Sequence, residues 1–189
     1  MLPTVVVRGR RNPLHFGLPA RLKRAREHLS YSSVADAAGI SDGQIVFRVE
    51  RKPDHVPRCD TVEKIAYALG LSPAFLAYGI EDHTTRPCDG LRCEGVASRL
   101  LTTRVARGLS MRALARAAGL TDTAVRTTET GATMPGIDTA EALSNALGVS
   151  PGWLAYGLGP VELPNRRAIR AKPTQAAPSE SDTTADGPS

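Results

Sequence analysis

The sequence is poor in aromatic residues and in cysteine. Aromatic side chains make up 4% of its 189 residues, although 41% of the residues are hydrophobic, so any core must consist mainly of aliphatic and alanine side chains. Such a core favours small helical domains over a large sandwich of aromatic-rich strands. The three cysteines are too few, and odd in number, for a disulfide scaffold.

Long apolar runs are also missing. No stretch approaches the roughly eighteen apolar residues that a membrane span needs. The opening residues, MLPTVVVRGRR, place basic residues after a short apolar run, which reverses the order of a secretory signal. We therefore expect a soluble cytoplasmic protein with no membrane partner. The formal net charge of +5 permits nucleic-acid binding but does not require it.

The chain contains an internal repeat. Residues 60–80 and 138–158 are identical at 12 of 21 positions, and residues 29–45 and 109–125 are identical at 7 of 17. The offsets of the two matches differ, and we expect one extra residue of the first repeat to lie between Ile45 and Glu50. Two copies indicate two domains rather than a solenoid.

The repeat divides the chain into five expected regions. These are a basic N-terminal arm (1–16), the first repeat (17–80), a polar linker (81–94), the second repeat (95–158) and a C-terminal tail (159–189). The tail is rich in Pro, Ala, Ser, Thr and Asp and too poor in apolar residues to fold alone, so we expect it to be disordered.

Each repeat carries five short helical patterns and no strand-like alternation. This predicts an all-α fold of two tandem five-helix domains joined by a short linker. For the fourth helix we expect Asp60 and Asp138 as N-caps, with Glu63 and Glu141 reaching back to them as in a capping box. The fifth helix begins at a Ser-Pro pair in both repeats.

The second and third helices of each repeat carry the functional motif. In the second repeat, Ser110 caps a short helix, Gly119 makes a turn, Thr121 caps the next helix and Val125 anchors it. The first repeat has similar residue types in the same order: Ser30, Gly39, Ser41 and Ile45. Small alanines let the two helices approach closely across the turn. This is the packing of a helix-turn-helix, whose second helix can enter a DNA major groove.

These motifs resemble the lambda-repressor-like helix-turn-helix family over residues 18–80 and 96–158. In the second repeat the resemblance is carried by Arg104, Gly108, Leu109, Ser110, Leu114, Ala115, Gly119, Leu120, Thr121, Val125, Glu129, Gly131, Pro135, Thr139, Leu147 and Gly148. The resemblance implies sequence-specific binding to double-stranded DNA. It also implies transcriptional regulation in a bacterium, with repression as the expected direction.

We assign candidate DNA contacts to the start of the second helix, the exposed face of the third helix and the cations that follow it. In the first repeat these are Ser30, Tyr31, Asp42, Gly43, Gln44, Phe47, Arg48, Arg51, Lys52 and Arg58. In the second repeat they are Ser110, Met111, Arg112, Thr121, Asp122, Thr123, Arg126 and Thr127. The arm arginines Arg8, Arg10 and Arg11 either reach a minor groove or the DNA backbone, or belong to a solvated terminus.

Two further questions stay open at this point. The aromatic residues of the fifth helices either pack on their own domain or form an interface, within one chain or between two chains; they are Phe75, Tyr78, Trp153 and Tyr156. Pairing within the chain would make the two repeats a built-in dimer for an asymmetric or pseudo-palindromic site. Cys59, Cys88 and Cys93 are either ordinary reduced thiols or, with His83, part of a metal or redox site.

The rival interpretation is a protein-interaction module with degenerate helix-turn-helix domains that binds another regulator, a toxin or a polymerase. Tyr31 and Met111 favour it, because they stand where the family commonly has a DNA-holding Gln, and so do Asp42 and Asp122 near the start of each third helix. An enzyme has little support, since we find no nucleophile elbow, P-loop, metal triad or paired carboxylates. We therefore expect no catalysis and no bound cofactor.

Overall fold

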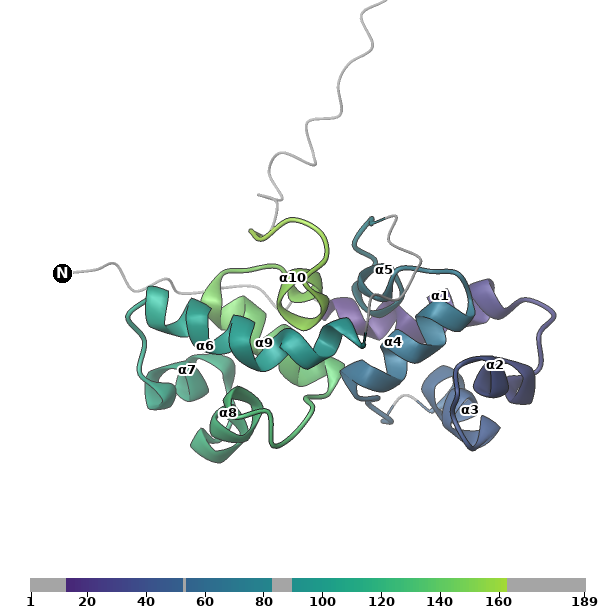
Figure 1. Cartoon of the computed structure of the whole chain (residues 1–189), viewed down its shortest axis with the longest axis horizontal. Coiled ribbons are helices and arrows are strands. Elements are labelled where there is room, and N and C mark those ends of the chain that lie inside the picture. The colour runs from purple at the N-terminus through teal and green to yellow at the C-terminus, as the bar shows by residue number, and fades with distance from the viewer. Residues whose placement is uncertain (1–12, 53, 83–89, 163–189) are drawn as a thin grey trace, which may run out of the picture.

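A computed structural model describes residues 13–52, 54–82 and 90–162 (Figure 1). Over these residues the chain is helical, with isolated β-bridges such as Arg58–Gly136 and no strand. The N-terminal half, residues 13–82, contains η1 (Leu14–Gly17), α1 (Leu18–Arg26), α2 (Tyr31–Ala37), α3 (Gly43–Arg51), α4 (Cys59–Ala68) and α5 (Pro73–Tyr78). The C-terminal half, residues 90–162, contains η2 (Arg92–Gly95), α6 (Val96–Ala106), α7 (Met111–Ala118), α8 (Asp122–Glu129), α9 (Ile137–Leu147) and α10 (Pro151–Tyr156).

Several helix boundaries fall at residues that suit a helix start or a helix end. Ser72 and Ser150 precede the Pro residues that begin α5 and α10, and α9 ends at Gly148, whose φ of +71° suits glycine. The two 3-10 helices lie in segments that we expected to be arm and linker. The arm arginines, Cys88, His83 and the tail from residue 163 lie outside the described residues.

The expected N-caps of the fourth helices are wrong. α4 is capped by Arg58 and α9 by Gly136, so Asp60 and Asp138 lie inside the first turn, where each accepts a hydrogen bond from the next residue's N–H. The glutamates three residues further on make no capping box. Instead, both glutamates accept hydrogen bonds from backbone N–H groups in the opposite half of the molecule.

Glu63 and Glu141 hold the 3-10 helices across the junction between the halves. On α4, the buried Glu63 accepts from the backbone N–H groups of Arg92 and Cys93 in η2, at 2.7 and 2.9 Å. On α9, Glu141 accepts from the N–H groups of Leu14 and His15 in η1, at 2.6 and 3.0 Å. Each half therefore supplies the acceptor for the other half's first turn.

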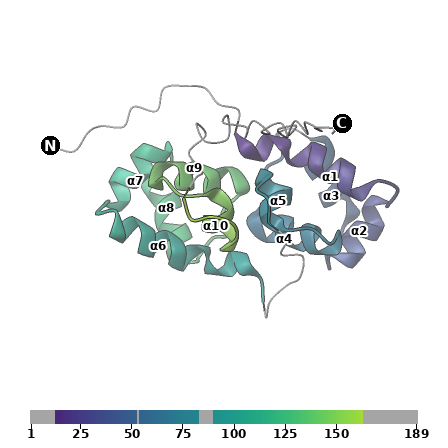
Figure 2. The same ribbon diagram turned by 90° about the horizontal axis from the view of Figure 1, so that it is seen from above.

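The fifth helices also meet at this junction. Seen from above, α5 and α10 lie side by side at the centre of the molecule (Figure 2). Gly152 permits the close approach, since a Cβ there would lie 3.0 Å from the Cβ of Ala74. The buried hydroxyl of Tyr78 donates to the carbonyl of Ile137 at 3.0 Å, and that of Tyr156 lies 3.4 Å from the carbonyl of Cys59. Both tyrosines thus bond across the junction.

The core follows the same pattern. One buried cluster lies within the C-terminal half and contains Leu100, Leu114, Val125 and Leu143. The other fills the N-terminal half but also takes in Ile137, Ala140, Ala155 and Tyr156 from the C-terminal half. Burial of apolar area is the main stabilising contribution to folding, so the N-terminal half depends on residues of its neighbour.

Within the described residues, no helix has both the length and the apolar character needed to cross a bilayer.

Candidate nucleic-acid interface

The α2–α3 and α7–α8 pairs have the local structure expected of helix-turn-helix units. Ser30 and Ser110 cap α2 and α7 and accept from the N–H groups three residues on. Gly39 and Gly119 then turn the chain with φ of +62° and +69°, a region that only glycine enters without strain. Thr121 caps α8 as expected.

The position expected for the extra residue of the first repeat is wrong. Asp42, rather than Ser41, caps α3 and accepts from the N–H of Gln44 at 2.8 Å. The fully buried counterpart of Val125 is Val46, and Ile45 is half-buried. The extra residue therefore lies in the turn before α3, where a loop lengthens without moving a core position.

A buried ion pair ties each unit to the helix before it. Arg26 of α1 donates to Glu50 of α3, with Nε 2.9 Å from Oε2. Arg104 of α6 donates to Glu129 of α8, with Nη2 3.0 Å from Oε2. Burial by itself raises the pKa of Glu50, but hydrogen bonds from Arg26 and Tyr31 outweigh burial and hold that pKa below its ordinary value. Glu50 therefore stays ionised and keeps its partners.

The two units lie on one side of the molecule, at opposite ends of its long axis. Figure 1 shows α3 and α8 along the lower edge, with α5 and α10 on the opposite side. This leaves α3 and α8 free to face a common surface.

Most candidate contact residues are exposed on these units. The exposed ones are Ser30, Asp42, Gln44, Arg48, Arg51, Lys52, Ser110, Met111, Arg112, Thr121, Asp122, Thr123 and Arg126. The half-buried ones are Tyr31, Gly43, Phe47 and Thr127. Arg48 therefore points outward, whereas Phe47 rests with its ring edge-on to Tyr31. Arg58 is exposed but lies at the junction between the halves, where it forms a β-bridge with Gly136.

The two surfaces differ in the state of their charges. In the C-terminal half, Arg112 lies 3.5 Å from Asp122, so these candidate contacts partly neutralise each other. In the N-terminal half, no described residue forms an ion pair with Arg48 or Lys52. The N-terminal surface therefore offers more unpaired positive charge to an anionic partner such as DNA.

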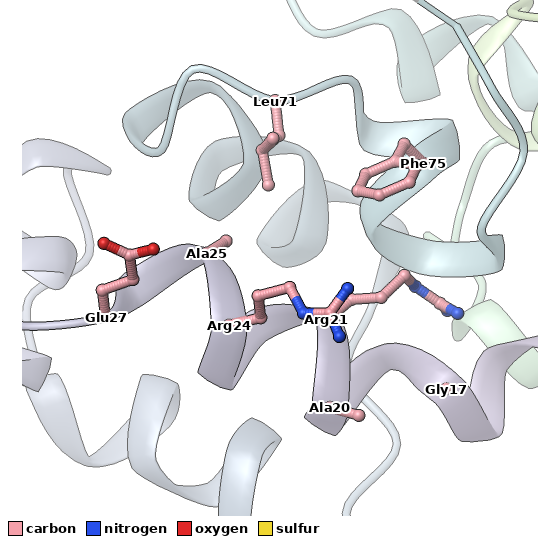
Figure 3. Close-up of a pocket in the computed structure, with 8 residues that line it drawn as sticks. All are labelled: Gly17, Ala20, Arg21, Arg24, Ala25, Glu27, Leu71 and Phe75. Carbon is pink, nitrogen blue, oxygen red and sulfur yellow. The ribbon is translucent and has the colours of Figure 1, made fainter.

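A groove of about 470 Å³ lies between α1 and α5 and is lined by none of the candidate contact residues. Leu71 and Phe75 face α1 across it, and Arg24 extends along it (Figure 3). It takes no part in the candidate interface.

The cysteines offer little chemistry in the described structure. Burial raises the pKa of Cys59 to about 12 and also raises that of Cys93, so both stay protonated thiols at neutral pH. Among the described residues, no group of three or more His, Cys, Asp or Glu side chains is placed to hold a metal ion.

Comparison with known proteins bears on the C-terminal half. Residues 100–154 match the family model described as Helix-turn-helix (HTH_3). The matched segment is therefore similar to helix-turn-helix domains of the XRE type. The match runs from within α6 to α10 and includes α7 and α8. This is a family of DNA-binding regulatory domains rather than of enzymes. Searches of curated proteins and of solved structures found no match.

The sequence did not reveal the residues that join the halves. The spacing of Glu63 and Glu141 predicts capping boxes, and the sequence predicts no site for His15. One sequence signal could have pointed to these residues. Both glutamates occupy the same position of the repeat, and the next helix ends in a tyrosine in both halves.

Proposed function

We propose that this protein is a sequence-specific transcriptional repressor in which each half is a helix-turn-helix unit. The observation that carries the proposal is the repeated junction, which keeps α3 and α8 on one side of a single chain. The N-terminal half repeats the caps, the glycine turn and the Arg–Glu pair of the family-matched half.

A paired junction within one chain replaces the dimer that such domains commonly need. Related dimers read half-sites about one helical turn, or roughly 34 Å, apart. Here the second contact is intramolecular, which raises affinity without new contacts. Because α3 and α8 carry different side chains, the site is asymmetric or only pseudo-palindromic.

The exposed faces of α3 and α8 supply the reading groups. On α3, Gln44 and Arg48 contact the bases, since Gln pairs with adenine and Arg with guanine in the major groove. Thr123 and Arg126 serve α8. The protein would act on the chromosome in the bacterial cytoplasm.

The deciding experiment selects binding sites from a random duplex pool and then counts chains per selected duplex by native mass spectrometry. We expect one chain per duplex and two protected segments about one helical turn apart. Arg48→Ala should remove protection from one segment and Arg126→Ala from the other.

Two results would contradict the proposal in different ways. Two chains on a strict palindrome would reject the single-chain arrangement but keep the regulator. An unenriched pool with weak binding that is insensitive to sequence would favour the protein-interaction module, and Arg112–Asp122 pairing would then explain the poor C-terminal surface.

A further inference from the structure

The N-terminal half carries a side-chain network on its α2–α3 surface. Tyr31, the first residue of α2, donates its hydroxyl to Oε1 of Glu50 at 2.9 Å. The same hydroxyl oxygen lies 3.4 Å from Nε of Arg51 and 3.4 Å from Nη2 of Arg26, both of which donate to it. One phenol therefore links α1, α2 and α3.

The Tyr31 ring is fixed from two directions. The guanidinium carbon of Arg26 lies 4.2 Å from its centroid, which is a cation–π contact. The ring of Phe47 meets it edge-on, at 5.4 Å between centroids and 89° between planes, a favourable aromatic geometry. The hydroxyl is thus held in one place.

Arg51 is the cation that this arrangement orients. It ends α3, and its side chain is 56% exposed. Its Nε faces Tyr31 and also lies 3.3 Å from Glu50, whereas no described residue accepts from its Nη groups. Glu50 is already paired twice with Arg26, so Arg51 keeps charge for an outside partner.

The C-terminal half has no such arrangement. Met111 takes the place of Tyr31, and Thr130 takes the place of Arg51. Thr130 turns its hydroxyl back to carbonyls of its own helix. The Arg104–Glu129 pair is present without a third cation.

We propose that Tyr31 is a positioning residue that aims Arg51 at a phosphate of the DNA backbone, so that the N-terminal half supplies more phosphate affinity than the C-terminal half. This inference rests on the proposed function. Guanidinium groups bind phosphate oxygens through paired N–H donors, and the free Nη edge of Arg51 offers that pairing.

The test measures the affinity of the full chain for a mixed-sequence duplex across a range of salt concentrations. The variants are Arg51→Ala, Tyr31→Phe and the two combined. Arg24→Ala is the matched control, because it removes the same charge from the exposed groove side of α1. Phosphate contacts are independent of base sequence, so this duplex reports them directly.

We expect Arg51→Ala to weaken binding about 5- to 10-fold and to lower the salt slope by about 0.9, the value for one lost phosphate contact. Tyr31→Phe should weaken binding about 2- to 5-fold. In the Arg51→Ala background, Tyr31→Phe should have no further effect. Arg24→Ala should change affinity less than 2-fold, and Arg112→Ala should cost less than Arg51→Ala.

Each of the other outcomes contradicts one part of the proposal. If Arg51→Ala leaves the salt dependence of affinity unchanged, Arg51 makes no phosphate contact. Equal losses from Tyr31→Phe with and without Arg51 reduce Tyr31 to a structural residue, and a melting curve would show the matching loss of stability. Failure of the wild-type chain to bind any duplex would reject the proposed function itself, whereas wild-type binding with unaffected variants rejects this inference alone.

Discussion

The α2–α3 and α7–α8 regions share a scaffold and differ on its surface. Both have a serine cap, a left-handed glycine and an Arg–Glu pair. Their exposed residues diverge, with an aromatic and cationic network in one and a self-paired Arg112 in the other. Buried groups have few alternatives that keep every partner satisfied, whereas surface groups can change at little energetic cost. The repeat therefore preserves the local geometry of these helix pairs, whereas the exposed side chains on them differ.

Replacing the buried carboxylates Glu50 and Glu129 should have the largest effect on stability. The size of the loss should differ between the two regions. Breaking a buried pair costs about 3–5 kcal/mol, because the remaining charge is left without a partner. Glu50→Ala strands Arg26 and frees Tyr31, so we expect a loss near the upper limit. Glu129→Ala strands Arg104 alone and should lie near the lower limit. Urea unfolding measures both, and equal losses would mean that the Tyr31 network adds no stability.

The junction allows a second comparison of the same kind. Glu63→Ala leaves the N–H groups of Arg92 and Cys93 without an acceptor in a buried site, and we expect a loss of about 3 kcal/mol. Glu141→Ala acts on Leu14 and His15, which lie nearer to solvent, and should cost about 2 kcal/mol. Thermal melts of both variants check the order, and a greater loss in Glu141→Ala would contradict it.

The Glu141 site should also make stability depend on acid pH. Burial alone raises the pKa of Glu141, but hydrogen bonds from the His15 side chain and from two backbone N–H groups lower it below 4.5. A lowered folded-state pKa contributes stability that is complete above the unfolded pKa and is lost as pH falls through the folded value. We expect Glu141→Gln to flatten unfolding free energy against pH below about 4.5. If Glu141→Gln leaves the dependence of unfolding free energy on pH unchanged, other carboxylates cause the acid sensitivity. Glu50, whose pKa is also lowered, would be the next to test.

The turn glycines should show the smallest effect and no difference between the halves. A Cβ added to Gly39 or Gly119 would meet no atom within 4 Å, so the cost comes only from the left-handed backbone, about 1 kcal/mol each. Chemical denaturation of Gly39→Ala and Gly119→Ala should give equal losses. A clear difference would show that the extra turn residue Ser41 changes the strain at Gly39.

The helical fold and the position of the α7–α8 unit could be predicted from the sequence. Capping serines, turn glycines and apolar spacing are local signals, and each acts within a few residues of its own position. The position of the extra turn residue could not be read, because Ile45 and Val46 are both apolar and only packing decides which is buried.

The junction escaped prediction for a different reason. The spacing of Asp60 and Glu63 fits a capping box, yet Glu63 bonds to residues about thirty positions away. The carboxylate meets buried N–H groups there, and these would cost more free energy unpaired than an exposed helix end that water can satisfy. Likewise Tyr31 could be placed at the start of α2, but its link to Arg51 depends on how α2 and α3 cross.

The exchanged glutamates also set an order of events during synthesis. A ribosome releases the chain from its N-terminus, and domains ordinarily fold as they emerge. Here the N–H groups of Leu14 and His15 find their acceptor only in Glu141 of the C-terminal half. The apolar cluster of the N-terminal half likewise includes Tyr156. The first half of the chain therefore cannot complete its packing until most of the second half has been translated. We therefore expect a fragment that ends between the halves to leave that apolar surface exposed to solvent.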